Sequence, residues 1–282
     1  MPPARVTVVS DTHLAERSPS SAEQWDAVLA HLAADPPDLV VHAGDISCDG
    51  CVEPDDLAFA RDHLARVPMP LMSVPGNHDI GESAVEEGYD HVLVDADRLA
   101  RYRATLGPDR FSVAAGAWRI VGLDAQVLDS GLPDEADQWA WLESELASDR
   151  TNGPVALVLH KPVVPPPGQV HRLIRYVSER SRDRLLALLG QAGGRLVVTG
   201  HVHQSLRHVA GSLDHVWAPT SWAVLPDRVQ APVGDKIVGV VALTLHDDGR
   251  VDSVVQVPAG IHQGTLGDDV DVPFDGLPPT LL

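Results

Sequence analysis

Short apolar runs alternate with segments of helical periodicity along most of this chain. Buried parallel strands are hydrophobic on both faces, so short apolar runs predict them. We predict such strands at residues 6–10, 39–41, 71–74, 155–159 and 196–198. Apolar residues three or four positions apart predict helices at residues 22–33, 54–64, 138–146 and 181–189. This alternation of strand and helix indicates an α/β fold with parallel strands.

The remaining apolar segments predict antiparallel strands in a second sheet layer. Residues 110–114 and 119–123 flank Ala115-Gly116, and this arrangement is typical of a hairpin. We predict further antiparallel strands at residues 216–218, 236–245 and 251–257. The Pro-rich segment 163–169 predicts an irregular loop, because proline removes a backbone donor and fixes φ.

Length and composition fit one large α/β domain or two small ones, and we favour one. A chain of 282 residues with 44% hydrophobic residues can bury a sizeable core. We predict a single domain over residues 1–262. Residues 263–282 are rich in Gly, Pro and Asp and show little periodicity, so they are expected to form an extended tail.

Polar residues that can bind metals follow five of the predicted strands directly. The segments are Asp11-Thr12-His13, Gly44-Asp45, Gly76-Asn77-His78-Asp79, His160-Lys161-Pro162 and Gly200-His201-Val202-His203. In open α/β sheets, ligands bind at the carboxyl ends of the strands. Five strands that bring Asp, His and Asn to one edge therefore predict a shared metal site. Each block alone occurs by chance, so the prediction depends on all five together.

The candidate ligands are Asp11, His13, Asp45, Asn77, His160, His201 and His203. Asp11 and His13 are two residues apart, so in an extended segment both side chains point to the same side. His201 and His203 repeat this spacing. Asp45 carries two carboxylate oxygens and can therefore bridge two ions. Seven ligands exceed the four that a structural zinc takes, and a set of oxygen and nitrogen ligands suits iron, manganese or catalytic zinc.

The five blocks, in this order over residues 11–203, resemble the signature of the calcineurin-like metallophosphoesterases. The resemblance implies a four-layer α/β/β/α sandwich with two central mixed β-sheets, and a catalytic domain over residues 1–262. It implies that a first metal ion is held by Asp11, His13, Asp45 and His203. It implies that a second ion is held by Asp45, Asn77, His160 and His201. Residues 75–81 most resemble the small bacterial branch that hydrolyses cyclic nucleotides and glycerophosphodiesters.

The resemblance implies hydrolysis of a small phosphodiester, with a 3',5'-cyclic nucleotide as one candidate. Two ions would lower the pKa of a bridging water, orient the phosphorus and neutralise charge on the phosphoryl oxygens. His78 is expected to stabilise the transition state or protonate the leaving oxygen, so His78 and Asp45 are the predicted catalytic residues. Asp79 either orients His78 or caps the following turn. Asn77, His78 and Lys161 are the candidate substrate contacts.

Two positions depart from the family pattern. Many relatives carry an acid three residues beyond the bridging aspartate, where this chain has Cys48, and Asp49 is the expected substitute. Lys161 stands where this branch often has a histidine, and it would either contact a substrate phosphate or extend to solvent. With no second cysteine pair available for zinc, Cys48 and Cys51 are expected to be two reduced thiols in a loop.

Several other residues have both a structural and a functional interpretation. His42 is predicted to be a packed group behind the ligands. Trp217 and Trp222 are predicted to pack in the core rather than stack on a substrate base. A basic lip at the pocket and a solvated loop are equally consistent with His171, Arg172 and Arg175. Structural or exposed positions are expected for His63, His91, His208, His215, His246 and His262.

The charge restricts the class of partner. A formal net charge of −19 opposes binding to nucleic-acid backbones and to anionic lipid, so neither a polymer nor a membrane is expected. A small anionic substrate would need local positive charge, which bound metal ions supply. No apolar stretch reaches the length of a membrane span, and the N-terminus lacks an export pattern, which predicts a cytoplasmic protein. A homodimer or a higher homo-oligomer stays open.

Two alternatives to a phosphodiesterase stay open. A phosphomonoesterase or a pyrophosphatase would share the same metal centre, because neither the ions nor His78 select the substrate. A scaffold that keeps the fold without catalysis is the non-enzymatic alternative. Such scaffolds typically lack ligands, whereas this chain has all seven. A nuclease is disfavoured because no basic stripe is present.

Overall fold

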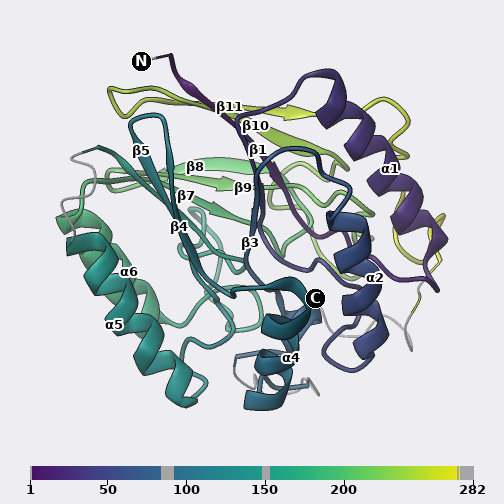
Figure 1. Ribbon diagram of the computed structural model, residues 1–282, viewed down its shortest axis with the longest axis horizontal. Coiled ribbons are helices and arrows are strands. Elements are labelled where there is room, and N and C mark those ends of the chain that lie inside the picture. The colour runs from purple at the N-terminus through teal and green to yellow at the C-terminus, as the bar shows by residue number, and fades with distance from the viewer. Residues whose placement is uncertain (1, 84–91, 148–152, 272, 274–282) are drawn as a thin grey trace.

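Two β-sheets form the centre of the molecule (Figure 1). The computed structural model describes residues 2–83, 92–147, 153–271 and 273. In spatial order, the first sheet comprises β11 (Val251–Gln256), β10 (Val240–Leu245), β1 (Ala4–Val9), β2 (Leu39–His42) and β3 (Leu71–Ser73). The second sheet comprises β4 (Phe111–Ala115), β5 (Trp118–Gly122), β6 (Val155–Val158), β7 (Gly194–Thr199), β9 (Leu213–Trp217) and β8 (Leu206–Ala210).

Helices cover the outer faces of the two sheets. They are α1 (Pro19–Ala34), α2 (Pro54–Leu64), α3 (Asn77–Ile80), α4 (Ala96–Leu106), α5 (Pro133–Ala147) and α6 (Glu179–Gln191). In Figure 1, α1 and α2 lie on one side of the sheets and α5 and α6 on the other. The predicted four-layer α/β/β/α sandwich with two mixed sheets is therefore confirmed.

Side chains on alternating faces of the strands build the three largest buried clusters of the described residues. Val8 of β1 and Val158 of β6 face each other's sheet and belong to one buried cluster between the sheets. Val9, the next residue of β1, packs outward with Trp25 of α1 in a second cluster. A third cluster joins the outer face of the second sheet to α5 and α6, and it includes Trp139. Strands buried on both faces in this way explain the continuous apolar runs of the sequence.

The strands that lead to the candidate ligands belong to two sheets. In the first sheet, β1, β2 and β3 run parallel, and in the second, β5, β6, β7 and β9 run parallel. Antiparallel strands complete each sheet: β10 and β11 in the first, β4 and β8 in the second. We expected all the ligands at the edge of one sheet, and this expectation needs correction. Strands β1, β2 and β3 lie in the first sheet, whereas β6 and β7 lie in the second, so the ligand-bearing loops come from two layers.

Several elements differ from the sequence prediction. Helices α1 and α5 begin earlier than expected, at Pro19 and Pro133, because proline at the first helical turn loses no hydrogen bond. The sequence analysis missed α3, α4 and β8. Helix α4 is rich in charged residues and buries only Leu99 and Tyr102, so few apolar residues mark it in the sequence. Residues 71–74 were predicted as a buried strand, but β3 is a partly exposed edge strand.

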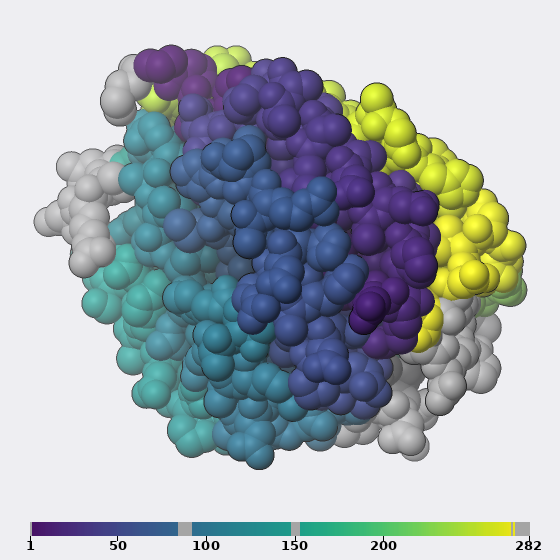
Figure 2. All heavy atoms as spheres, turned by 45° about the vertical axis from the view of Figure 1, so that its right-hand side comes forward, coloured from purple at the N-terminus to yellow at the C-terminus, as the bar shows by residue number. Residues whose placement is uncertain are grey.

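The described part of the C-terminal segment lies against the domain. Leu266 donates a backbone hydrogen bond to Val224, and Gln24 of α1 bonds to the backbone of His262. Figure 2 shows these yellow C-terminal residues beside α1. Residues 272 and 274–282 lie outside the described residues, so the division at residue 262 stays a prediction. Within the described ranges, no helix combines the length and apolar character that crossing a membrane requires.

Candidate metal centre

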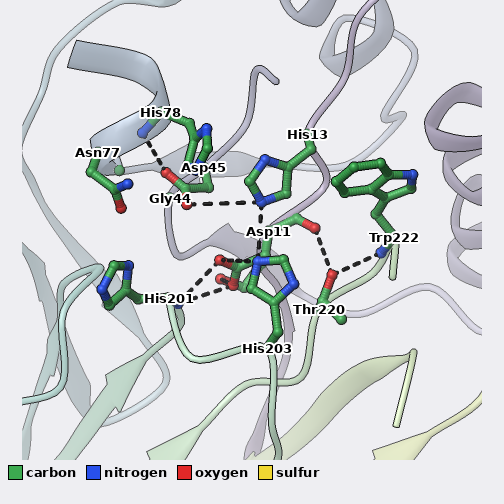
Figure 3. Close-up of polar contacts among 12 residues, drawn as sticks. Asp11, His13, Gly44, Asp45, Asn77, His78, His201, His203, Thr220 and Trp222 are labelled. Atoms are coloured by element: carbon green, nitrogen blue, oxygen red, sulfur yellow. Dashed lines mark hydrogen bonds and ion pairs between the residues drawn. The ribbon is translucent and has the colours of Figure 1, made fainter. Parts of the chain in front are cut away.

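The candidate ligands come together in loops that follow five strands. Asp11 and His13 follow β1, and Asp45 follows β2 (Figure 3). Asn77 begins α3 after β3, and His160 follows β6. The pair His201 and His203 lies in the loop after β7. The first and second sheets thus contribute three and two loops to one centre.

The backbone is left-handed rather than extended at five of the seven candidate ligands. Non-glycine residues rarely adopt positive φ, and such conformations cost about 1–3 kcal/mol each. In the described part of the chain, the non-glycine residues with positive φ are Asp129 and the candidate ligands Asp11, His13, Asp45, His201 and His203. The expectation that an extended segment aims Asp11 and His13 to one side is therefore wrong. Successive left-handed kinks direct these side chains inward instead.

Two glycines make room for ligand side chains. A Cβ atom at Gly76 would lie 2.1 Å from Asp45 Oδ1 and 2.3 Å from the Asp45 backbone nitrogen. Gly44 has φ of 98°, and a Cβ atom there would lie 2.5 Å from His160 Nδ1. The Gly-Asp and Gly-Asn pairs of the sequence therefore have a steric cause, because any side chain at the glycine would displace a ligand.

Asp11, His13 and His203 form the first cluster. His13 Nε2 lies 3.1 Å from His203 Nε2, and His203 Nε2 lies 3.5 Å from Asp11 Oδ1. The backbone nitrogen of His201 donates to both Asp11 carboxylate oxygens, each at 3.1 Å. Potential ligand atoms of the three residues lie within 4.8 Å of one another, close enough to share one ion.

Asp45, Asn77, His160 and His201 form the second cluster. His160 Nε2 is at its centre, 3.1 Å from Asp45 Oδ2, 3.1 Å from Asn77 Oδ1 and 3.2 Å from His201 Nδ1. Asp45 Oδ2 also lies 3.8 Å from His13 Nε2 of the first cluster. Asp45 therefore stands between the clusters, as a bridging carboxylate must.

Backbone carbonyls fix the protonation of the histidine rings. A carbonyl oxygen only accepts hydrogen bonds, so the ring nitrogen that faces it carries the proton. His160 Nδ1 donates to Ala43 at 2.8 Å, His201 Nε2 to Ile174 at 2.6 Å and His203 Nδ1 to Ala223 at 2.7 Å. The other nitrogen of each ring therefore faces the centre, where it can bind a metal ion through its lone pair once it carries no proton.

The resulting donor set fits metal ions. When His160 Nε2 carries no proton, the facing atoms His160 Nε2, His201 Nδ1, Asn77 Oδ1 and Asp45 Oδ2 are all acceptors, and His160 Nε2 lies within 3.2 Å of each of the others. Acceptors at such separations repel one another unless a cation lies between them. Outer-nitrogen hydrogen bonds to carbonyls are also the usual way in which proteins orient metal-binding histidines.

The pKa shifts of Asp45 and His160 also show that the centre favours positive charge. Burial raises the pKa of Asp45, but His160 and His78 outweigh it and hold the pKa well below its usual value. Burial lowers the pKa of His160, yet the Asp45 carboxylate outweighs burial and raises that pKa to about 9. Without a metal ion, His160 Nε2 therefore carries a proton that faces Asp45 Oδ2, and a metal ion bound there would replace that proton. Burial, reinforced by neighbouring charges, lowers the pKa of His13 and His201, which keeps both rings neutral for coordination.

His78 is held by the backbone at Cys48. His78 Nδ1 donates to the Cys48 carbonyl oxygen at 2.7 Å, and the His78 backbone nitrogen donates to Asp45 Oδ1 at 2.9 Å. The expectation that the Asp49 carboxylate replaces the missing acid needs correction. A main-chain carbonyl can orient the ring as an acid would, and the Asp49 carboxylate instead accepts from Cys51 Sγ.

Asp79 ties two loops together. Its carboxylate accepts hydrogen bonds from the backbone nitrogens of Gly76, Ile46 and Ser47, and from the Ser47 hydroxyl at 2.6 Å. Of the two interpretations of this residue, the structure supports the capping one. Burial raises the pKa of Asp79 to about 6, with the Asp45 charge as a second cause.

Lys161 is buried rather than solvated. Its side chain is 1% exposed and forms an ion pair with Glu82. The ammonium also donates to the Leu173 carbonyl at 3.1 Å. The alternative in which this side chain extends to solvent is therefore wrong, while the predicted contact with a substrate stays a prediction.

The remaining predictions have mixed outcomes. Trp217 and Trp222 are each 1% exposed, which confirms core packing, although the Trp222 ring also lies 5.1 Å from that of His13. His42 is packed behind the centre against Thr12 Oγ1 at 2.9 Å, and burial lowers its pKa to about 3. Cys48 and Cys51 are free buried thiols, as expected. His91 lies outside the described residues. The basic lip stays a prediction.

Sequence reasoning missed the groups that orient the ligands. The carbonyls of Ala43, Ile174 and Ala223 have no side-chain signal, because any residue supplies a carbonyl oxygen. Glu82, which pairs with Lys161, could have been suspected only as a carboxylate soon after the Asn77 block. A contact so distant along the chain cannot be read from one sequence.

Comparison with known proteins identifies the class to which this fold and centre belong. Residues 4–205 match the model of the calcineurin-like phosphoesterase family. The match covers most of the chain and includes all five ligand-bearing loops. The chain therefore belongs to this family, and it is a metal-dependent phosphoric ester hydrolase.

Individual relatives agree with this placement. The chain is 26% identical over 253 residues to a "Probable cyclic nucleotide phosphodiesterase" of Synechococcus sp., covering 86% of this chain and 88% of the relative. It is 25% identical over 259 residues to a 3',5'-cyclic-nucleotide phosphodiesterase of Nostoc sp., covering 88% and 90%. A dimetal phosphatase from Danio rerio shares the fold, with a TM-score of 0.61, 15% identity and coverage of 92% and 100%.

Proposed function

We propose that this protein is a dinuclear metal phosphodiesterase that hydrolyses small soluble diesters, with 3',5'-cyclic nucleotides as the leading candidates. The observation that carries the proposal is the set of convergent acceptors around Asp45, which two cations would satisfy. The substrate class is supported by the names of the relatives in Synechococcus and Nostoc, which match nearly the whole chain.

The two clusters supply the ligands. Asp11, His13, Asp45 and His203 would hold the first ion. Asp45, Asn77, His160 and His201 would hold the second ion. Mixed oxygen and nitrogen ligands accept iron, manganese or zinc, so we propose these three metals as the candidates. Ions bound there would supply Lewis acidity that activates a water and neutralises charge on the phosphoryl group.

Substrate is expected to approach from the side of α3. Asn77, His78 and His201 are partly exposed, whereas the other candidate ligands are buried. The Cys48 carbonyl occupies His78 Nδ1, so Nε2 is the ring atom that would exchange a proton with the leaving oxygen. The amide of Asn77, one residue before His78, would position a phosphoryl oxygen from the same side.

The alternatives differ from the proposal in their substrate or in their lack of chemistry. A phosphomonoesterase or a pyrophosphatase would use the same centre. A catalytically silent scaffold of this fold would not need every metal ligand or the carbonyls that orient the histidine rings. The complete donor set therefore favours an enzyme over a scaffold.

A substrate panel on metal-loaded protein tests the proposal. We expect bis(p-nitrophenyl) phosphate and cyclic nucleotides to be hydrolysed with kcat/KM at least about tenfold above that of p-nitrophenyl phosphate. Glycerophosphodiesters and sugar-nucleotide diphosphates complete the panel. Preference for the monoester or for the diphosphates would replace the diester assignment. No hydrolysis by protein whose two ions have been confirmed by elemental analysis would favour the scaffold.

A further inference from the structure

Lys161 and Glu82 form a buried ion pair that the proposed chemistry does not use. Their side chains are 1% and 4% exposed. Removing two charges from water costs several kcal/mol per ion, and their attraction restores this only with good geometry and additional hydrogen bonds. Such a pair beside a metal centre calls for an explanation beyond general stability.

The contacts of Lys161 lead to two ligands of the second cluster, His160 and His201. Lys161 is the chain neighbour of His160, so its backbone is continuous with that ligand. Its ammonium donates to Leu173 at 3.1 Å, and the next residue, Ile174, provides the carbonyl that receives the His201 Nε2 proton at 2.6 Å. One side chain thereby connects the loops of His160 and His201.

Glu82 connects the third loop. It lies two residues after α3, the helix that begins with Asn77, and Gly81 between them donates to the Asn77 carbonyl at 2.8 Å. The backbone of Glu82 is fixed by hydrogen bonds of 2.8 Å to Val92 and from Val94. The ion pair with Lys161 thus anchors the Asn77 loop to the loop of His160.

We propose that Lys161 is a positioning residue for the second metal ion. With Glu82, it holds the loops that carry Asn77, His160 and His201 at the separations that one ion requires. This inference rests on the proposed function, because it presupposes the second ion. The first cluster, formed by Asp11, His13 and His203, has no contact with the pair among the hydrogen bonds and ion pairs described.

Positioning and simple electrostatics predict opposite effects of removing the lysine. Lys161→Met deletes a positive charge and leaves Glu82 negative near the second ion, so charge alone would tighten cation binding. Loss of positioning would weaken it. Glu82→Gln leaves the Lys161 ammonium without its counter-ion. The unpaired positive charge and the lost positioning then both weaken binding of the second ion. In Glu82→Gln/Lys161→Met no charge is left unpaired, and only positioning is lost.

Titration with Mn²⁺ of metal-free protein, followed by equilibrium dialysis, measures both dissociation constants. We expect Lys161→Met and the double variant to raise the second dissociation constant at least about tenfold, and the first less than about twofold. Glu82→Gln is expected to show the largest rise. The kcat at saturating Mn²⁺ should recover toward the wild-type value, and KM should remain within about twofold. Arg103→Met, which breaks the Arg103–Asp109 pair of 2.8 Å elsewhere in the fold, is the matched control for lost stability.

Each other outcome overturns the inference. Unchanged metal binding with a raised KM would make Lys161 a substrate contact. Tighter second-ion binding in Lys161→Met would reduce its role to charge. Equal weakening of both ions, in these variants and in Arg103→Met, would indicate general loosening. If Lys161→Met does not fold, the double variant decides. Wild-type protein that binds fewer than two ions would instead refute the proposed dinuclear centre itself.

Discussion

Asp45 is the residue on which both clusters depend, because its Oδ2 atom lies near His13 of the first cluster and His160 of the second. Asp45→Asn keeps the shape but removes one bridging oxygen and the negative charge. We expect kcat for a diester to fall by at least about three orders of magnitude, while the fold remains intact. Steady-state kinetics at saturating metal, with circular dichroism as the control for folding, measure this. Near-normal turnover would eliminate the bridging mechanism.

His78 is predicted to act on the substrate and not to hold an ion. His78→Ala should lower kcat by about 10²–10⁴-fold, the usual contribution of a general acid, and leave two ions bound. Elemental analysis of the variant beside kinetic assays separates the two roles. A variant that has lost an ion would show that His78 is a ligand, a result its position near His13 and Asp45 makes worth checking. His246→Ala serves as the control, because His246 lies in the turn between β10 and β11, where its ring contacts Asp252 and, among the described residues, no candidate ligand.

The sequence predicts which residues are candidate ligands, but not the backbone conformation and hydrogen bonds that orient their side chains. Gly44-Asp45 and the Asn77 block are recognisable because acid, amide and imidazole groups recur after apolar runs. The left-handed φ angles of Asp11 and His13 have no sequence signal, since these residues adopt such conformations only when the surrounding fold enforces them. Main-chain groups such as the Cys48 carbonyl are equally invisible, and their role is found only in the structure.

At the scale of elements, strands β8 and β9 carry a stacked histidine pair. His208 and His215 are direct cross-strand partners with ring centroids 4.9 Å apart and an interplanar angle of 14°. Burial lowers the pKa of His215 to about 4, and the charge of His208 contributes. The His215 ring nitrogen Nε2 is buried without a hydrogen-bond partner among the described residues. The pair therefore resists protonation.

The linkage between this pKa and folding gives a pH prediction. The unfolded chain binds a proton at His215 below about pH 6.5, whereas the folded chain binds it only near pH 4. The free energy of unfolding therefore does not depend on His215 above about pH 6.5. It decreases as the pH falls from about 6.5 to 4, and His215 causes no further loss below about pH 4. We expect His215→Phe to be more acid-resistant, by roughly 2–3 kcal/mol between pH 7 and 4. Urea unfolding at several pH values measures the difference, and parallel curves for both proteins would refute it.

Element boundaries show which local signals are reliable. The β4–β5 hairpin and the start of α2 at Pro54 follow directly from turn and proline chemistry, and both are confirmed. Strand β8 was missed because Arg207 and His208 interrupt its short apolar pattern. It forms because β9 offers a partner edge, and such tertiary pairing overrides weak local propensity.

At the scale of the whole molecule, the centre lies where the two sheets meet. Loops after β1, β2 and β3 come from one sheet, and loops after β6 and β7 from the other. The sequence predicted the sandwich because the ligand blocks resemble one family. Assignment of strands to one sheet or the other depends on long-range pairing such as β1 with β10, which a pattern of apolar runs does not encode.

Removing the metal ions should lower the thermal stability of the protein, because the proposed ligands come from loops of both sheets. Ions held jointly by ligands from both layers bind the folded state and not the unfolded chain, so they stabilise by mass action. At Mn²⁺ or Zn²⁺ concentrations about 100 times the dissociation constant, one site contributes about 2.7 kcal/mol. For a chain of this size, that corresponds to a rise in Tm of roughly 4–5 °C for each occupied site. Differential scanning calorimetry of EDTA-treated protein, with and without added metal, measures the shift. In Asp45→Asn, which weakens both sites, the rise should be less than half as large. A Tm that does not respond to metal, in protein whose hydrolysis requires it, would show that the unfolded chain binds the ions as tightly as the folded protein does.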